Sequence, residues 1–387
     1  MRKDYFLKDT APLPLIQAPS LNGEVATVSG YTFSLGDLTK ISIHTPDMVF
    51  IVDNEQVGVL DDGEDNMIWK GVTIDGEANV FIVTDSTGKP IFINIREGTS
   101  DISMIATSAA GYGPLPSHSD EFGTDSMVMI SSNDYDEDRL KTECLYDAEE
   151  NDDAGFVDTV DFFPTKIENH NRQLQSCQEL TSIDVAIIFE SSFCMQHGGP
   201  DGARSRILAI IAMASSSYEV DGLCTTIRLS YLEGYCDPAT DIYKDVVGNP
   251  DLLSIFRNHW VDHRADFNLY PRDVAHLFTG TRFSSSSVIG VAYMHGVCQA
   301  STGYGLNWIT FTPDLTLQSS LFAHELGHNS GAPHYDESSG IMTSSNGGAQ
   351  EFHPVSRYHM REYLNGLSCL ETVNGGGDGG DGGGGGG

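Results

Sequence analysis

The residues best suited to chemistry in this chain lie close together around position 330. Residues 324–334 contain the pattern H-E-x-x-H-x-x-G-x-x-H, in which His324 and His328 are four residues apart. On a helix, side chains at this spacing project from one face about one turn apart. Two imidazoles placed in this way can bind one Zn²⁺ ion at roughly 2.0–2.1 Å. The spacing therefore predicts a zinc site built on a helix.

Gly331, His334 and Glu325 complete the predicted site. Glycine accepts the left-handed backbone of a sharp helix exit, so Gly331 should end the helix and return His334 as the third ligand. A fourth position is then left for water, as a catalytic zinc requires. We expect Glu325 to take a proton from the zinc-bound water, whose pKa zinc lowers to about 7, and to pass it to a leaving amine. These roles predict hydrolysis of a peptide bond.

The full pattern is far more specific than H-E-x-x-H alone. At the His, Glu and Gly frequencies of this chain, a chance match is expected roughly once in ten thousand such chains. The alternative interpretation is a solvated helix whose histidines are incidental.

The region around this pattern, residues 177–372, alternates strand and helix signals. Apolar positions at helical spacing predict one helix that Asp201 caps and a second around 252–260. Strands are expected at 183–189, 226–231, 273–278 and 289–294. Such alternation indicates an α/β fold, which we interpret as a catalytic domain.

Three other zones differ from this domain in composition. Residues 1–132 alternate apolar and polar positions in short runs, such as 48–52, 79–83 and 90–94, and predict a β-rich domain. Residues 133–176 are strongly acidic and indicate an exposed linker. Residues 373–387 are almost pure glycine, which predicts a flexible tail.

The charge of the chain limits its partners. It carries 21 basic and 55 acidic residues, a formal net charge of −34, which repels nucleic acid and anionic lipid surfaces. No apolar run reaches the roughly 18 residues that a membrane-spanning helix needs. The basic N-terminus lacks a following apolar stretch, so no secretory signal is visible. Protein or peptide substrates remain the expected partners.

Seven cysteines indicate the redox environment. Six lie between positions 177 and 369, and Cys144 stands apart. This distribution predicts three disulfides and one free thiol in an oxidising compartment. The alternative is a set of buried, reduced cysteines.

The motif and its surroundings resemble the reprolysin (adamalysin) family of metzincins. Residues 324–334 are similar to that family's signature, including Asn329, and 339–342 resemble its Met-turn, with Met342 beneath the zinc. Residues 273–280 and 290–298 resemble strands that precede the zinc helix, the second being the edge strand that binds substrate antiparallel. The resemblance, over about 180–370, implies a mixed twisted sheet, a zinc-binding helix and a small C-terminal subdomain.

The same resemblance implies further features. It pairs Cys298 with Cys369 and makes residues 1–132 a propeptide-like domain, so the enzyme would be a secreted zymogen. Cys144 could then be a thiol switch that occupies the open zinc position, the alternative being a free or intermolecularly paired thiol. The other four cysteines allow three connectivities, of which sequence proximity favours Cys177–Cys194 and Cys224–Cys236.

The chain also departs from the family pattern. Tyr335, in place of the usual aspartate, follows the third ligand, and Gly340 replaces a cysteine before the Met-turn. These departures concern the subfamily and the loop disulfides, and they leave the zinc ligands unchanged. Two other functions are also considered. One is an adhesive or binding protein on an inactive metalloprotease scaffold; the other is an active enzyme in which residues 1–130 are a permanent binding module.

Overall fold

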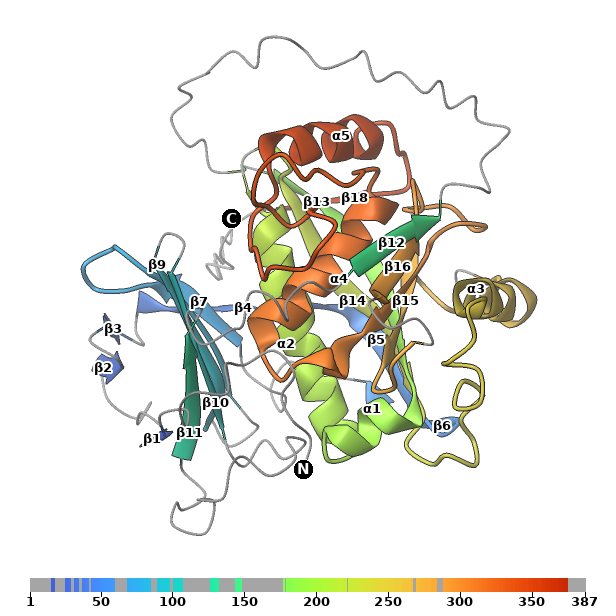
Figure 1. The fold of residues 1–387 in the computed structure, drawn as a ribbon, viewed down its shortest axis with the longest axis horizontal. Coiled ribbons are helices and arrows are strands. Elements are labelled where there is room, and N and C mark those ends of the chain that lie inside the picture. Colours follow the sequence, from blue (N-terminus) through green and yellow to red (C-terminus); the bar gives the residue numbers. More distant parts are fainter. Residues whose placement is uncertain are drawn as a thin grey trace, which may run out of the picture.

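The computed structural model gives the fold of most of the chain (Figure 1). It describes residues 15–17, 25–28, 31–34, 37–41, 43–59, 68–84, 89–97, 100–106, 126–131, 143–147, 177, 179–220, 222–266, 269–283 and 288–374. Of the predicted acidic linker, only residues 143–147 are described. Of the predicted Gly-rich tail, only residues 373 and 374 are described.

A nine-stranded sheet is the centre of the fold, with the strand order β12-β16-β17-β15-β13-β14-β5-β6 and with β18 paired to β13. Strands β5, β14, β13, β15 and β17 are mutually parallel along this order, whereas β16 runs antiparallel to β17. The strands are β5 (His44–Val52), β6 (Glu55–Val59), β12 (Glu143–Asp147), β13 (Glu179–Phe189), β14 (Thr225–Gly234), β15 (Val274–Thr279), β16 (Val288–Tyr293), β17 (Tyr304–Trp308) and β18 (Glu371–Asn374).

Helices cover both faces of this sheet. In β13, Val185 and Ile187 pack into the core that contains α2 (Pro200–Tyr218) and α4 (Leu315–Asn329). The alternate residue Ile188 packs on the other face, against α3 (Leu252–His263). Burial on both faces explains why β13 is a continuous apolar run. The predicted strands and the two predicted helices of this region are confirmed, but Asp201 does not cap its helix: Gly199 is the N-cap, and Asp201 lies inside the first turn of α2.

Shorter helical elements were not predicted. They are α1 (Ser191–Gln196), α5 (Pro354–Leu364) and a 3₁₀ turn, η4 (Ile309–Phe311). Glu190 begins α1 by accepting hydrogen bonds from the backbone N–H groups of Ser192 and Phe193. Among the described residues, no helix is long and apolar enough to cross a membrane.

A second, seven-stranded antiparallel sheet lies beside the first (Figure 1). Its order is β1-β11-β10-β9-β8-β7-β4, and β2 and β3 form a separate pair. The strands are β1 (Leu15–Gln17), β2 (Val25–Val28), β3 (Tyr31–Ser34), β4 (Thr39–Ile41), β7 (Ile68–Val72), β8 (Asn79–Thr84), β9 (Pro90–Glu97), β10 (Ser100–Ala106) and β11 (Ser126–Ser131). Phe81 and Phe92 of this sheet belong to the same core as α2 and α4.

The segment 44–59 joins the central sheet, although the sequence places it in a separate N-terminal domain. β5 pairs in parallel with β14, and β6 lies outside it. Asp53, in the turn between these strands, accepts hydrogen bonds from Cys236 N at 3.0 Å and Thr240 Oγ1 at 2.6 Å. The sheet therefore contains strands from both ends of the chain.

Three disulfides link the described residues: Cys177–Cys224, Cys194–Cys236 and Cys298–Cys369. The pairing of Cys298 with Cys369 is confirmed, whereas the pairs chosen by sequence proximity are wrong. Cys177 and Cys224 precede the parallel neighbours β13 and β14, while Cys194 and Cys236 follow them. Parallel pairing brings strand starts together and strand ends together, so each bridge spans one end of the pair.

Candidate metal centre

Helix α4 carries two of the three predicted ligands through the centre of the domain. Asp314 begins the helix, because its carboxylate accepts a hydrogen bond from Thr316 N at 2.6 Å. All residues of α4 are buried, including His324 and His328 at 1% and 0% exposure. The two imidazoles therefore lie on one face of a helix that the core holds in place.

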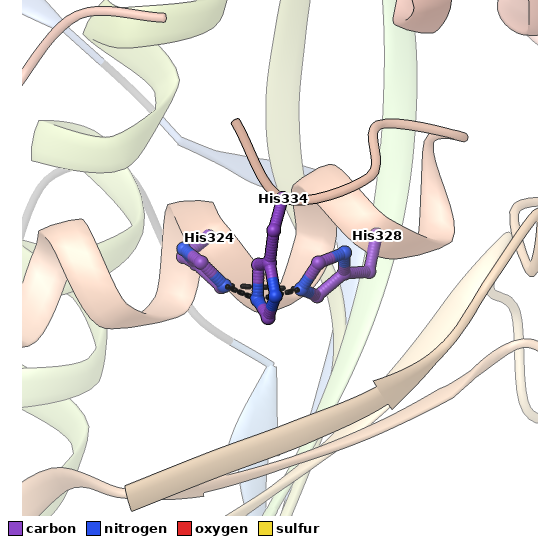
Figure 2. Close-up of side chains that lie close together, drawn as sticks. All are labelled: His324, His328 and His334. Atoms are coloured by element: carbon purple, nitrogen blue, oxygen red, sulfur yellow. Dashed lines mark hydrogen bonds between the residues drawn. The ribbon is translucent and has the colours of Figure 1, made fainter. Parts of the chain in front are cut away.

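The predicted helix end occurs at Gly331. This residue has φ +93°, and its N–H donates to His328 O at 2.9 Å. Ala332 N donates to Gly327 O at the same distance, so the chain turns back across the last turn of α4. The turn brings His334 beside the two helical histidines, as Figure 2 shows.

The three Nε2 atoms converge on one point. They lie 3.0 Å apart for His324 and His328, 3.1 Å for His324 and His334, and 3.2 Å for His328 and His334. A tetrahedral ion with Zn–N bonds of roughly 2.0–2.1 Å requires nitrogens about 3.3 Å apart. The observed triangle is close to that size.

The opposite ring nitrogens determine which atoms face the centre. His324 Nδ1 lies 2.6 Å from Ile341 O, and His328 Nδ1 lies 2.8 Å from Ala332 O. A carbonyl oxygen only accepts, so each Nδ1 carries the hydrogen and each neutral Nε2 presents a lone pair. Burial lowers the pKa of His324 to about 3 and that of His328 well below its ordinary value. Converging lone pairs on neutral rings fit a cation, and the three histidines could bind a metal ion.

Glu325 lies against the strand that faces the site. It is 0% exposed, and a Cβ atom at Gly290 of β16 would stand 2.1 Å from Glu325 Oε1. Gly290 therefore provides the space for the carboxylate. A side chain at this position would occupy that space.

Residues 339–342, which resemble a Met-turn, pack against α4. A Cβ atom at Gly327 would lie 2.5 Å from Met342 Sδ, so the thioether packs directly on the helix backbone. Tyr335 N donates to Met342 O at 2.8 Å, which ties the segment after His334 to this turn. Met342 thus packs against the helix backbone at Gly327, and the carbonyl oxygen of Ile341 lies 2.6 Å from His324 Nδ1.

The backbone of Cys144 lies at the outer edge of the same strand. β12 pairs in parallel with β16, and Cys144 stands opposite Gly290 in the register. Figure 1 shows β12 alongside β16 and close to α4. A segment far from the histidine motif in sequence therefore lies along the strand edge next to Glu325.

Comparison with known proteins shows which family the part of the chain around the histidine triad resembles. Residues 179–362 match the family model Reprolysin_5, described as metallo-peptidase family M12. This part of the chain is therefore similar to reprolysin-like metzincin domains. The family uses zinc, and His324, His328 and His334 could hold it.

Individual relatives match over shorter stretches. The zinc metalloproteinase-disintegrin-like brevilysin H2a of Gloydius brevicauda is 31% identical over 155 residues, which are 39% of this chain and 34% of that protein. The snake venom metalloproteinase trimerelysin-2 of Protobothrops flavoviridis is 37% identical over 65 residues, covering 17% and 31% respectively. This chain thus spans about a third of the length of either relative.

Among solved structures, metalloproteinase-II from Bacteroides fragilis aligns with a TM-score of 0.49 and 13% identity, covering 86% of this chain and 87% of that chain.

Sequence reasoning did not find several residues around the site. Gly290 and the carbonyl oxygens of Ile341 and Ala332 carry no chemical motif, because a missing side chain and backbone atoms leave no residue-type signal. His276 was also passed over, since it has no neighbour in sequence that could form a motif with it. It lies 53 residues from Asn329 in the sequence, and the fold brings the two side chains into direct contact.

Proposed function

We propose that this protein is a zinc-dependent endopeptidase with His324, His328 and His334 as metal ligands and Glu325 as general base. The observation that carries the proposal is the convergence of three Nε2 atoms, two of them on the helix that also carries the buried Glu325 carboxylate. Zn²⁺, when bound there, would supply a Lewis acid that polarises the scissile carbonyl and makes water more acidic.

The residues of the chain then divide the remaining work. Glu325 takes the proton from the attacking water and delivers it to the leaving amine, so one carboxylate serves both steps. Its position after His324 on a rigid helix keeps it beside the ligands without further adjustment. Ile341 O and Ala332 O hold the imidazoles in the tautomer that presents Nε2 to the ion.

We also propose that the chain is made as a zymogen in which β12 blocks the substrate strand. A substrate would extend the sheet at β16, antiparallel to it, as the family resemblance implies. β12 takes this edge, but in the parallel direction. A peptide that runs the opposite way presents its bonds to Glu325 in reversed order, so it occupies the edge without being a substrate. Activation requires removal of β12 from β16.

The Cys144 thiol switch is a second part of this proposal. The register that places Cys144 opposite Gly290 puts its backbone next to the strand residue that contacts Glu325. Thiolate is a strong zinc ligand, and a bound thiolate would fill the fourth position needed by water. Secretion fits this scheme, because three disulfides form in an oxidising compartment and trimerelysin-2 is a venom protein.

The test is hydrolysis of casein by the full chain, before and after cleavage at a protease site engineered within 148–176. Glu325→Ala and a zinc chelator provide the controls. We expect cleavage by the nicked protein only, with loss of activity in either control. Bound zinc with no hydrolysis of any protein or peptide would favour a binding protein on an inactive scaffold. A folded sample that binds no zinc would contradict the proposed function.

A further inference from the structure

A buried polar chain connects the end of the zinc helix to the edge strand. Asn329, the last residue of α4, is 0% exposed and follows His328. Its Nδ2 donates to Tyr293 O at 2.8 Å and to Tyr304 O at 3.2 Å. Tyr293 ends β16 and Tyr304 begins β17, so one amide joins the helix to both strands.

His276 contacts the other end of this amide. The imidazole is 0% exposed on β15, and its Nε2 lies 2.9 Å from Asn329 Oδ1. Its Nδ1 lies 2.9 Å from Asn307 Nδ2. A Cβ atom at Gly305 would stand 2.4 Å from His276 Cε1, and the ring of Phe322 packs edge-on at 5.2 Å. The ring therefore has a single place in the core.

The donors and acceptors of these hydrogen-bonded side chains allow only one arrangement. The carbonyls of Tyr293 and Tyr304 require donors, which fixes Nδ2 of Asn329 toward them and Oδ1 toward His276. Oδ1 accepts, so His276 Nε2 must carry the hydrogen, and His276 Nδ1 must accept from Asn307. Burial lowers the pKa of His276 to about 3, which keeps the ring neutral at ordinary pH. A neutral ring matches this pattern because it has one donor and one acceptor.

We propose that His276 is a positioning residue for the substrate-binding strand. Its Nε2–H orients Asn329, and Asn329 holds the end of β16 at a fixed place relative to the metal ligands on α4. Two backbone hydrogen bonds lie beside this amide: His295 N to His328 O and Val297 N to Asn329 O, both at 3.1 Å. The Asn329 side chain thus adds a buried link between the proposed substrate strand and the metal helix to the two backbone hydrogen bonds of residues 295–297. The expected effect on substrate binding rests on the proposed peptidase function. The expected effect on the position of the strand does not.

The test compares His276→Phe, which keeps a ring but has no donor, with His276→Gln, which offers an amide donor and a carbonyl acceptor. His197→Phe is the control, because it makes the same substitution at a half-buried ring whose centroid lies 4.4 Å from that of Phe193 in α1. Hydrogen exchange is measured on the full chain, together with zinc content. In the His276→Phe protein, we expect exchange over 288–297 to accelerate roughly tenfold, since a buried hydrogen-bonded link is lost. His276→Gln should restore most of the protection, and zinc content should stay at the wild-type value.

Three results would overturn the inference: unchanged exchange in His276→Phe, an equal acceleration in His197→Phe, or loss of zinc in parallel with loss of protection. Nitrogen NMR of the wild-type imidazoles decides the case even if His276→Phe does not fold, because an Nδ1–H tautomer contradicts the scheme.

Activity is a separate readout. In the nicked enzyme, His276→Phe should raise KM roughly tenfold and leave kcat within about threefold, because strand placement affects substrate binding more than the base. The two proposals can fail separately. If His276→Phe exchanges faster but the nicked wild-type protein hydrolyses no peptide, the link is supported and the peptidase function is refuted.

Discussion

Gly290 and Glu325 are fitted to one another across the space between β16 and α4: a Cβ atom on the glycine would lie 2.1 Å from Oε1 of the carboxylate. Heavy atoms this close overlap, so any side chain at position 290 must displace the carboxylate or move the strand. The edge strand therefore controls where the proposed base sits. We therefore expect activity to depend on a glycine at position 290.

Substitution Gly290→Ala tests this relationship. We expect peptidase activity of the nicked protein to fall by about 10²-fold, because a misplaced base loses much of its proton-transfer advantage, while zinc content stays constant. Gly248→Ala is the control, since a Cβ atom there would have no neighbour within 4 Å and the residue does not have a positive φ. Normal activity in Gly290→Ala would show that the carboxylate can move without consequence.

Replacement of Glu325 by alanine should separate metal binding from catalysis. The three histidines stay in place, so we expect one zinc per chain, as in the wild type. Turnover should fall by about 10²–10⁴-fold, the usual contribution of a general base. Zinc content by atomic absorption and peptide hydrolysis are the two measurements. A variant that retains its zinc and more than a tenth of its kcat would exclude Glu325 as the base.

Cys144→Ser tests the thiol switch. If the thiolate blocks the metal, the intact variant should hydrolyse peptide at least about tenfold faster than the intact wild type. Tyr146→Pro tests the strand separately, because proline cannot donate to the ladder where Tyr146 faces Ala292. Activity released by Tyr146→Pro and not by Cys144→Ser would assign the inhibition to β12 alone.

Asp273 provides a prediction about pH. Burial raises its pKa to about 7 from 3.8, with the Asp184 carboxylate adding to the shift and Arg228 opposing it. The folded protein therefore binds this proton more tightly than the unfolded chain. The corresponding stability is fully present below about pH 4 and is lost as pH rises through 7.

Asp273→Asn removes this titration and can still accept the hydrogen bond that Asp184 N donates at 2.8 Å. We expect the variant to melt about 2–6 °C above the wild type at pH 8 and close to it at pH 4.5. Both proteins share all other titrating groups, so the difference between them reports Asp273. An equal difference at the two pH values would mean that the carboxyl does not titrate in this range.

The metal site could be predicted from sequence because its geometry is local. His324 and His328 are separated by one helical turn, and Gly331 and His334 follow within the next six residues. Helix periodicity and the left-handed tolerance of glycine are enough to bring these three rings together. Similarly, apolar periodicity identified β13, α2 and α3, since each buries one or two faces along a continuous segment.

Pairing between distant strands could not be predicted in this way. A strand's own pattern says which face is buried but not which neighbour it has, so nothing in 48–52 indicated β14 as the partner. The wrong disulfide pairs have the same cause. Cys194 is close to Cys177 in sequence, but a parallel strand separates them, and its neighbour β14 carries Cys236 to the same end of the sheet.

The position of β5 beside β14 has a consequence for biosynthesis. Asp53 and its partner Cys236 are 183 residues apart, and synthesis proceeds from the N-terminus at about 5–20 residues per second. β5 therefore waits roughly 10–40 seconds for β14 to be made, and one of its edges is unpaired in the meantime. Contacts of such long range also slow folding itself. This protein should depend on chaperones or on slow translation more than its length alone suggests.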